Sequence, residues 1–272
     1  MTAVQHAASG AMKRTWLSHH RERVLGTVVT LDVFGEPDVA RKEVYLRIAR
    51  ARALLHRADA VFSTWKEHSP INQLRRGEIT VAEAPREVAT VLEACAMARS
   101  LSDGWFDPWA MPGGLDPSGF VKGWAAQHAL GALSMPGVTG GIVNAAGDVV
   151  ASGSPGPCRP FRVAILDPSD RRRFACVVEL DGGIATSGTY ERGEHLIDPP
   201  TGQPVARAAS ASVTGPDLGL ADALATALAV AGPAGLAFIE PIEGYEGYVI
   251  GYDGSWQSTA NFPFDTRPRP GP

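Results

Sequence analysis

Apolar residues recur at the three- and four-residue spacing of a helix face in several stretches of the chain. In the first, Pro37 stands where a helix begins, and one buried stripe is approximated by Val44, Ile48, Leu55 and Phe62. Comparable patterns predict helices over residues 37–60, 85–101, 118–133 and 221–231, with a short one at 234–241.

Short runs rich in β-branched residues and bounded by Gly, Pro, Asn or Asp predict strands. They cover residues 25–34, 161–166, 174–180, 183–185 and 210–213, with two hairpins at 140–153 and 248–259. We expect one α+β domain over residues 19–264, with a mostly antiparallel sheet core and helices packed on it. Residues 1–18 would form a flexible tail, and the proline-rich residues 265–272 a disordered one.

The last long helix is apolar on nearly every side. Its stripe of Leu220, Leu224 and Leu228 lies about 200° from Asp222 and Thr226, which are also four residues apart. Such a helix should be buried, and a buried carboxylate must be paired, neutralised or bound to a metal. A carboxylate and a hydroxyl one turn apart suit Mg²⁺, with substrate phosphates completing its shell. A capping or hydrogen-bonded core pair explains the same spacing equally well.

A glycine-containing turn before the helix at 118–133 is typical of an anion site. Ser118 and Gly119 let main-chain amides approach an anion at the helix N-terminus, and Lys122 lies one turn further along. Together with Asp116, these residues indicate a platform for phosphate and metal. A plain helix cap followed by a solvated lysine is the alternative interpretation.

Two polar loops carry further candidates. The loop at 62–77 holds Trp65, which is either a core anchor or a stacking surface for a planar ligand. A turn-forming stretch between two strands holds His195, close in sequence to Thr186, Ser187 and Asp198. Function often resides in loops between strands, although a lone histidine is more often structural or on the surface.

Composition narrows the choice of partners. The 272 residues are 44% hydrophobic and 20% charged, with a net charge of −4 and no long run of one sign. Neither nucleic acid nor an anionic membrane surface is therefore expected as a main partner. The three cysteines are widely spaced, residues 1–18 contain no apolar run of signal length, and no stretch approaches eighteen uninterrupted apolar residues. We expect a cytoplasmic protein without a membrane anchor that acts on small molecules or proteins.

Eight sets of short motifs follow one another along residues 25–230. They are Leu25-Gly-Thr27, Phe62-Ser-Thr-Trp65 with Ser69-Pro-Ile-Asn72, Gly104-Trp-Phe-Asp-Pro108, Asp116-Pro-Ser-Gly-Phe-Val-Lys-Gly123, Val143-Asn-Ala-Ala-Gly-Asp148, Ala185-Thr-Ser-Gly188, His195-Leu-Ile-Asp-Pro199 with Thr201-Gly202, and Ala221-Asp-Ala-Leu-Ala-Thr226. In this order they closely resemble the motifs of the ApbE family of flavin transferases. The resemblance implies an ApbE-like architecture related to the T-fold. It also implies Mg²⁺-dependent transfer of FMN from FAD to a Ser or Thr hydroxyl of a target flavoprotein, with release of AMP.

The resemblance also implies roles for individual residues. A Mg²⁺ ion would be held by Asp222, Thr226 and the backbone carbonyl of Gly119. The FAD site would be lined by Leu25, Trp65, Trp105, Phe106, Asp107, Asp116, Lys122, Thr186, Ser187 and His195. Lys122 would stabilise the phosphate oxygens during transfer. His195 would assist deprotonation of the attacking hydroxyl, with Asp198 as a competing base.

Four positions depart from the family motifs. Leu25 replaces the usual methionine, Trp65 the usual tyrosine, Ala146 a glycine, and Pro200 the usual arginine after Asp-Pro. Loss of that arginine removes a phosphate or local structural contact, which is expected to weaken transferase activity more than FAD binding. Two alternatives stay open: an FAD pyrophosphatase that yields FMN and AMP, and a non-catalytic FAD-binding protein. The sequence contains no Gly-x-Gly-x-x-Gly motif, which disfavours a nicotinamide-type redox enzyme.

Overall fold

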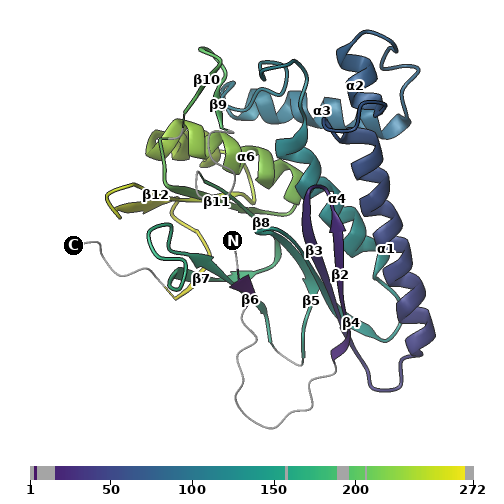
Figure 1. Cartoon of the computed structure of the whole chain (residues 1–272). Helices are drawn as coiled ribbons and strands as arrows, with labels where there is room; N and C mark the ends of the chain where they lie inside the picture. Colours follow the sequence, from purple (N-terminus) through teal and green to yellow (C-terminus); the bar gives the residue numbers. More distant parts are fainter. Residues whose placement is uncertain (1–2, 5–15, 157–158, 189–195, 206, 267–272) are drawn as a thin grey trace.

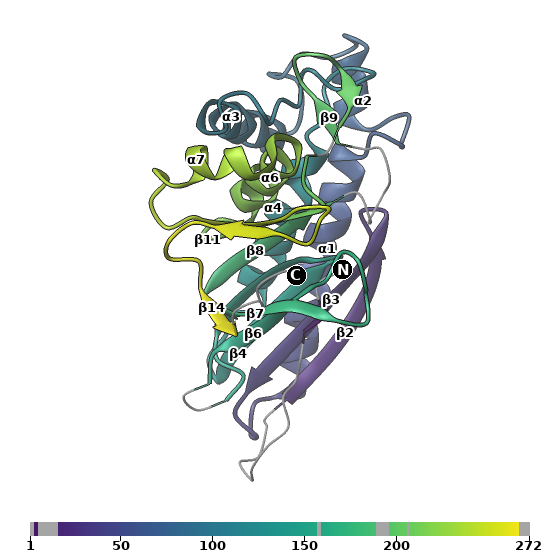
Figure 2. The same ribbon diagram turned by 90° about the vertical axis from the view of Figure 1, so that its left-hand side faces the viewer.

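The computed structural model describes residues 3–4, 16–156, 159–188, 196–205 and 207–266. These residues form three layers, with helices on one face of a large antiparallel sheet and a smaller sheet on its other face (Figure 1, Figure 2). The predicted α+β class, with a mostly antiparallel sheet and packed helices, is therefore confirmed.

The large sheet has eight strands in the order β13-β12-β11-β8-β5-β4-β3-β2, and all neighbouring pairs are antiparallel. Its strands are β2 (Trp16–Val24), β3 (Thr27–Gly35), β4 (Val138–Ala145), β5 (Asp148–Gly153), β8 (Gly182–Ser187), β11 (Ser210–Gly215), β12 (Glu246–Ile250) and β13 (Trp256–Ser258). Both predicted hairpins are present, and the other strands predicted in this sheet differ from the observed ones only at their ends.

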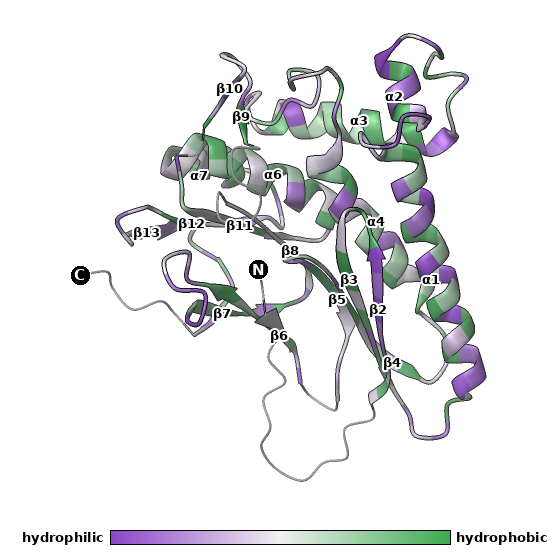
Figure 3. Ribbon diagram, viewed as in Figure 1, coloured by the Kyte–Doolittle hydropathy of each residue, from purple (hydrophilic) through white to green (hydrophobic). Residues whose placement is uncertain are grey.

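Two boundaries expected from the sequence differ in the N-terminal hairpin: the start of the strand predicted over residues 25–34 and the end of the tail predicted over residues 1–18. Strands β2 and β3 join through Leu25 and Gly26, whose φ angles are 56° and 68°, so Leu25 belongs to a tight turn. Strand β2 begins at Trp16, so residues 16–18 belong to the sheet and not to a flexible tail. Polar residues dominate β2, which is largely purple in Figure 3, because alternate side chains of this edge strand face solvent.

The four long helices are α1 (Arg41–Phe62), α3 (Arg86–Leu101), α4 (Ser118–Ala132) and α6 (Leu218–Ala231). Helices α1, α4 and α6 pack against one face of the large sheet, and α3 packs on α6 and α4. Shorter helical segments are α2 (Pro70–Arg75), η1 (Gly232–Gly235) and α7 (Leu236–Ile239). All four long predicted helices are confirmed. Helix α1 begins after Pro37 because residues 36–39 form a turn, in which the Val39 N–H donates to the Glu36 carbonyl at 3.3 Å.

Helix α6 is the most deeply buried helix. All its residues except Thr226 are buried, and it packs against β8, β11, α3 and α4. The segment Leu218–Ile239 is long and apolar enough to cross a membrane, yet 72% of its apolar stretch is buried inside the protein. Packing in the core accounts for this apolar character.

The smaller sheet has the order β1-β6-β7-β14, formed by β1 (Ala3–Val4), β6 (Phe161–Leu166), β7 (Phe174–Leu180) and β14 (Phe264–Thr266). It covers the large sheet through a second apolar core that includes Ile142, Val149, Val163 and Val178. Asp265 lies in β14 and pairs with Arg162 at 3.0 Å. Residues 3–4 and 265–266, expected in the two tails, are therefore part of this sheet.

Candidate functional site

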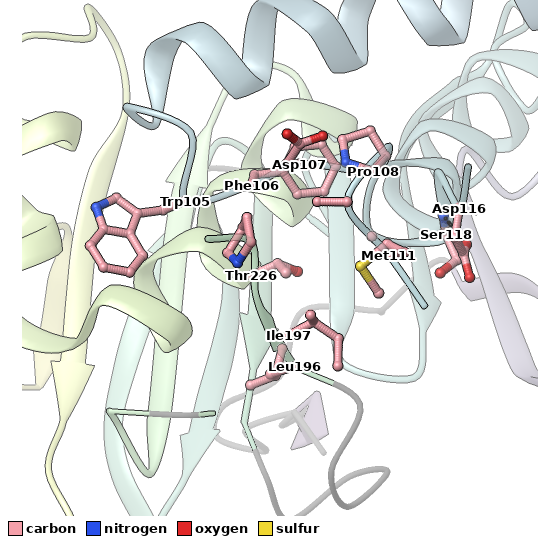
Figure 4. A pocket seen from close by; sticks show the side chains of 13 residues that line it. Trp105, Phe106, Asp107, Pro108, Met111, Asp116, Ser118, Leu196, Ile197 and Thr226 are labelled. Carbon is pink, nitrogen blue, oxygen red and sulfur yellow. Dashed lines mark hydrogen bonds between the residues drawn. The ribbon is translucent and has the colours of Figure 1, made fainter. Parts of the chain in front are cut away.

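A pocket opens where the loop after α3, the start of α4, helix α6 and a small hairpin meet (Figure 4). The hairpin consists of β9 (Ile197–Asp198) and β10 (Gln203–Pro204). In Figure 4, Phe106 and Asp107 lie on one side of Thr226, and Leu196 lies on the other. The lining residues are Trp105, Phe106, Asp107, Pro108, Ala110, Met111, Asp116, Ser118, Gly119, Leu196, Ile197, Pro199 and Thr226.

Close packing of α4 against α6 brings Gly119 to Thr226. A Cβ atom on Gly119 would lie 3.3 Å from the Thr226 Oγ1, and one on Gly123 would lie 2.3 Å from the Leu218 carbonyl oxygen. Glycine at 123 therefore permits the helices to approach this closely. The Thr226 Oγ1 also lies 3.3 Å from the Ser187 Oγ at the end of β8. The structure thus brings Gly119, Ser187 and Thr226 together.

The carboxylate of Asp222 is buried one turn before Thr226, with 2% of the residue exposed. Its Oδ2 accepts a hydrogen bond from the Gly123 N–H at 3.1 Å. In a regular α-helix that N–H donates to the carbonyl of residue 119. Asp222 therefore competes with the Gly119 carbonyl oxygen for this N–H group.

Lys122 and Asp148 complete a buried charged cluster around Asp222. The Lys122 Nζ lies 2.5 Å from the Asp148 Oδ2 and 3.9 Å from the Asp222 Oδ1. Asp148 is fully buried at the start of β5, and its Oδ1 accepts a hydrogen bond from the Thr186 N–H at 3.3 Å. Two carboxyl groups thus face one ammonium group, in a place where little water is available to solvate them.

The pKa of the Asp222 carboxyl group is raised well above its usual value. Burial is the largest cause, because it removes the water that stabilises the charged form, and the nearby Asp148 adds repulsion. The Lys122 ammonium and the Gly123 N–H act in the opposite direction without cancelling these effects. A further positive charge at this point would stabilise the ionised carboxylate.

The oxygen atoms beside this cluster fit a small, hard cation. The Asp222 carboxylate, the Thr226 hydroxyl and the Gly119 carbonyl belong to the ligand classes that Mg²⁺ prefers. Within the described residues, no three His, Cys, Asp or Glu side chains are grouped as a metal site. A cation here would therefore depend on hydroxyl and main-chain oxygens, and on water or a bound phosphate, to complete its shell.

The loop that forms the aromatic wall of the pocket is fixed at both ends. Helix α3 is followed by a C-terminal turn, in which Asp103 and Gly104 have positive φ angles of 51° and 81°. Beyond Trp105 and Phe106, the Asp107 Oδ2 pairs with the Arg99 Nε of α3 at 2.7 Å. These contacts hold the two aromatic residues at the pocket.

Asp116 lines the pocket and also starts helix α4. Its Oδ1 accepts a hydrogen bond from the Ser118 N–H at 2.9 Å, and its Oδ2 lies 3.8 Å from the Arg75 Nη2. Arg75 donates in addition to the carbonyls of Gly114 and Leu115, at 3.3 and 2.6 Å. Asp116 therefore stabilises the turn that leads into α4, whose N-cap is Pro117, and the same carboxylate stays at the pocket edge.

Leu25 and Trp65, two residues of the predicted FAD set, do not line the pocket. Leu25 occupies the β2–β3 turn. Trp65 is 94% exposed, on a loop held by the Asn72 Nδ2, which donates to the carbonyls of Thr64 and Lys66 at 3.0 and 2.9 Å. The interpretation of Trp65 as a core anchor is therefore wrong.

Thr186 reaches the charged cluster only through its main chain. Side chains alternate along β8, so Thr186 shares a face with Ile184, which belongs to the second core. The Thr186 Oγ1 lies 2.8 Å from the Ser212 Oγ. Its hydroxyl therefore lies on the opposite sheet face from Ser187 and Thr226.

The two predicted bases have different outcomes. His195 lies outside the described residues. Asp198 is in β9, where its neighbours Ile197 and Pro199 line the pocket but Asp198 does not. The Asp198 Oδ2 accepts a hydrogen bond from the Thr201 hydroxyl at 3.1 Å and lies 3.6 Å from the Arg207 Nη2. These contacts give Asp198 a structural role in the hairpin.

Two residues at the site are absent from the candidates that the sequence suggests. Asp148 follows the turn of its hairpin, which consists of Ala146 and Gly147, with φ angles of 55° and 105°. Side chains alternate along β5, so Asp148 points to the same face as Val150, toward the helices. This alternation is the sequence pattern from which Asp148 could have been predicted as a site residue. Arg207 gives no local signal, because its partners are distant in sequence.

Curated relatives match part of the chain. A protein from Klebsiella pneumoniae named FAD:protein FMN transferase is 33% identical over 159 residues, which are 53% of this chain and 45% of that protein. A protein of the same name from Rhodobacter capsulatus is 39% identical over 127 residues, 43% of this chain and 24% of its own length. The matched region thus spans less than half of each relative.

Solved structures share the fold over nearly the whole chain. The flavin transferase ApbE from Vibrio cholerae superposes with a TM-score of 0.75 at 22% identity, covering 89% of this chain and 96% of that one. The ApbE protein from Thermotoga maritima gives 0.78 at 23% identity, with coverages of 91% and 98%. The model of the ApbE family matches residues 25–113 and 110–249. The chain therefore belongs to the ApbE family.

Proposed function

We propose that this protein transfers FMN from FAD to a Ser or Thr hydroxyl of a target flavoprotein and releases AMP. One observation carries the proposal: an aromatic-walled pocket adjoins the oxygens of Gly119 and Thr226, beside the buried cluster of Asp222, Lys122 and Asp148. The relatives named FAD:protein FMN transferase support the same reaction.

The residues around α6 would hold the metal. Asp222, Thr226 and the Gly119 carbonyl would bind Mg²⁺, which when bound neutralises charge on the FAD pyrophosphate. The excess of carboxyl groups over ammonium groups in the buried cluster supports a cation at this point.

Lys122 and the start of α4 would stabilise the phosphate oxygens. The first N–H groups of a helix point toward its N-terminus and favour an anion there, and Ser118 and Gly119 lie in that first turn at the pocket wall. The ammonium group of Lys122, oriented by Asp148, would add a positive charge from one turn further along.

Trp105 and Phe106 would contact the planar rings of FAD. Both belong to the pocket lining, and flat aromatic surfaces stack well on ring systems such as flavin or adenine. The lining also includes the apolar side chains of Leu196 and Ile197, which favour a largely apolar ligand surface.

In the transfer step, the acceptor oxygen forms a bond to the FMN phosphorus while the bond from that phosphorus to the AMP oxygen breaks. The hydroxyl proton needs a base, and His195 is the residue that we assign to this role. Asp198 is the weaker choice, because its Oδ2 already faces Thr201 and Arg207.

Mass spectrometry tests the proposal directly. Purified protein is incubated with FAD, Mg²⁺ and a panel of flavoprotein domains, with a chelator in the parallel reaction. We expect an FMN-sized mass increment on one domain, and free AMP, only when Mg²⁺ is present. Free FMN and AMP in equal amounts without any modified domain would indicate a pyrophosphatase. FAD that stays intact would indicate a binding protein, and either result would contradict the transfer.

A further inference from the structure

Arg207 lies beside the C-terminal end of helix α6. Its main-chain N–H donates to the Ala229 carbonyl at 3.0 Å, and its Nη1 donates to the Val230 carbonyl at 2.8 Å. The helix then ends at Gly232, with φ of 72°, where an added Cβ atom would lie 2.8 Å from the Arg207 Cβ. A cation that satisfies C-terminal carbonyls stabilises the end of a helix.

The same guanidinium group contacts the aromatic wall and the hairpin. Its Cζ lies 5.0 Å from the centroid of the Trp105 ring, within the range of a cation–π interaction. Its Nη2 lies 3.6 Å from the Asp198 Oδ2 in β9. One side chain therefore connects the loop after α3, the β9–β10 hairpin and helix α6, and each of these three segments contributes residues to the pocket lining.

The hairpin has few contacts of its own that would hold it in place. Its strands are two residues long, and an isolated short hairpin is marginally stable in water. Within the hairpin, the Gly202 N–H donates to the Asp198 carbonyl at 2.8 Å and the Val205 N–H to the Leu196 carbonyl at 2.9 Å. The position of Leu196, Ile197 and Pro199 in the pocket therefore depends on contacts from outside the hairpin.

We propose that Arg207 is a positioning residue of this site, which holds Trp105 and the β9–β10 hairpin against the end of α6 and thereby sets the shape of the pocket. Only a planar guanidinium group stacks on a ring while its several N–H groups serve a carboxylate and a carbonyl. The part of the proposal that concerns FAD rests on the proposed function.

Hydrogen–deuterium exchange of the ligand-free protein tests the positioning role without any substrate. In Arg207→Gln, the amides of Gly202 and Val205 should exchange about tenfold faster than in the wild type. Arg207→Lys should fall between the two. Arg162→Gln is a matched control, because Arg162 is a surface arginine on β6 that is 45% exposed, against 43% for Arg207. Its exchange at 202 and 205 should equal that of the wild type.

FAD binding gives the second measurement. If the pocket loses its shape, the Kd for FAD in Arg207→Gln should rise about tenfold, because the protein must order the walls when it binds. The value of kcat at saturating FAD should change less, by about threefold at most, since Arg207 does not line the pocket. A purely structural residue would lower the amount of folded protein and leave the Kd of the folded fraction unchanged.

The outcomes separate this proposal from the proposed function. Unchanged exchange at 202 and 205 in Arg207→Gln would overturn the positioning role. If that variant does not fold, Arg207→Lys keeps the positive charge and removes the planar group, and unchanged exchange at 202 and 205 in Arg207→Lys would overturn the role equally. A wild-type protein that binds no FAD would contradict the proposed function, while the exchange experiment would still decide the role of Arg207.

Discussion

The two faces of the large sheet are both buried, but they bury different chemistry. On the face covered by the smaller sheet, the core consists of residues such as Phe34, Val149 and Tyr248, and the nearby Thr186 and Ser212 hydroxyls pair with each other. On the helix face, the apolar core surrounds three charged groups, those of Lys122, Asp148 and Asp222. Burying charged groups lowers the stability of the fold. The presence of these three residues on the helix face is therefore not explained by packing alone.

One face of the sheet therefore contributes mainly stability, and the other face carries the candidate site. Substitutions on the smaller-sheet face should change stability and leave the chemistry of each folded molecule intact. Substitutions in the charged cluster should change the chemistry and can even improve stability. The predictions below start from the largest expected effect.

Asp222→Ala should lower the proposed Mg²⁺-dependent turnover by about a thousandfold, because it removes the carboxylate from the proposed metal site. FAD binding should persist in part, since Trp105 and Phe106 are unchanged. Initial rates of FAD consumption across a Mg²⁺ titration measure the effect. Turnover at the wild-type level would contradict the assignment of Asp222 as a metal ligand.

Ile165→Ala should lower the free energy of unfolding by about 3 kcal/mol, because it opens a cavity in the second core, where Ile165 is fully buried. The value of kcat per folded molecule should equal that of the wild type. Urea denaturation gives the first quantity and an active-site titration the second. A large loss of kcat in the folded fraction would show that the two faces are not separable.

Asp222→Asn should raise the stability of the metal-free protein by about 1 kcal/mol, because it keeps the shape of the side chain and removes an ionisable carboxyl group that is buried beside Asp148. Turnover should be lost in the same variant. Denaturant midpoints in the presence of a chelator give the change. Val178→Ala is the control, because it removes buried apolar contacts on the other face and should only destabilise.

Glu22→Gln should have the smallest effect, below about 1 kcal/mol at neutral pH, because Glu22 forms a surface cluster with His20, Arg52 and His56. Hydrogen bonds from His20 and Arg52 lower the pKa of Glu22 to about 2. The stability that this group contributes is therefore present above its ordinary pKa of 4.5 and is lost as the pH falls towards about 2. Thermal unfolding between these pH values should show a flatter pH dependence in the variant.

The sequence predicts the parts of the fold that follow a local pattern. The leucine stripe at 220, 224 and 228 gives α6, and Asp103-Gly104 gives the end of α3. Strand β2 escapes prediction because its run from His19 to Arg23 is polar and charged, as an edge strand allows. Strands of two or three residues, such as β9 and β14, carry too few positions to form a period.

The sequence predicts those parts of the candidate site whose residues lie on the same helix or strand. Asp222 and Thr226 occupy one helix, so their spacing suggests a site. The pairing of Lys122 with Asp148 joins α4 to β5, and no local pattern specifies that contact. Trp65 shows the opposite error, because its size suggests burial while its loop leaves it 94% exposed.

The nearly complete burial of α6 has a consequence for genetics. In a mutational scan scored by protein abundance, almost every position of this helix should appear essential, since 13 of its 14 residues are buried. Such a scan would rank the packing leucines highest and hide the chemistry. Position 222 should stand apart as the place where asparagine raises abundance while abolishing the proposed flavin transfer, so abundance and activity scores together would identify it.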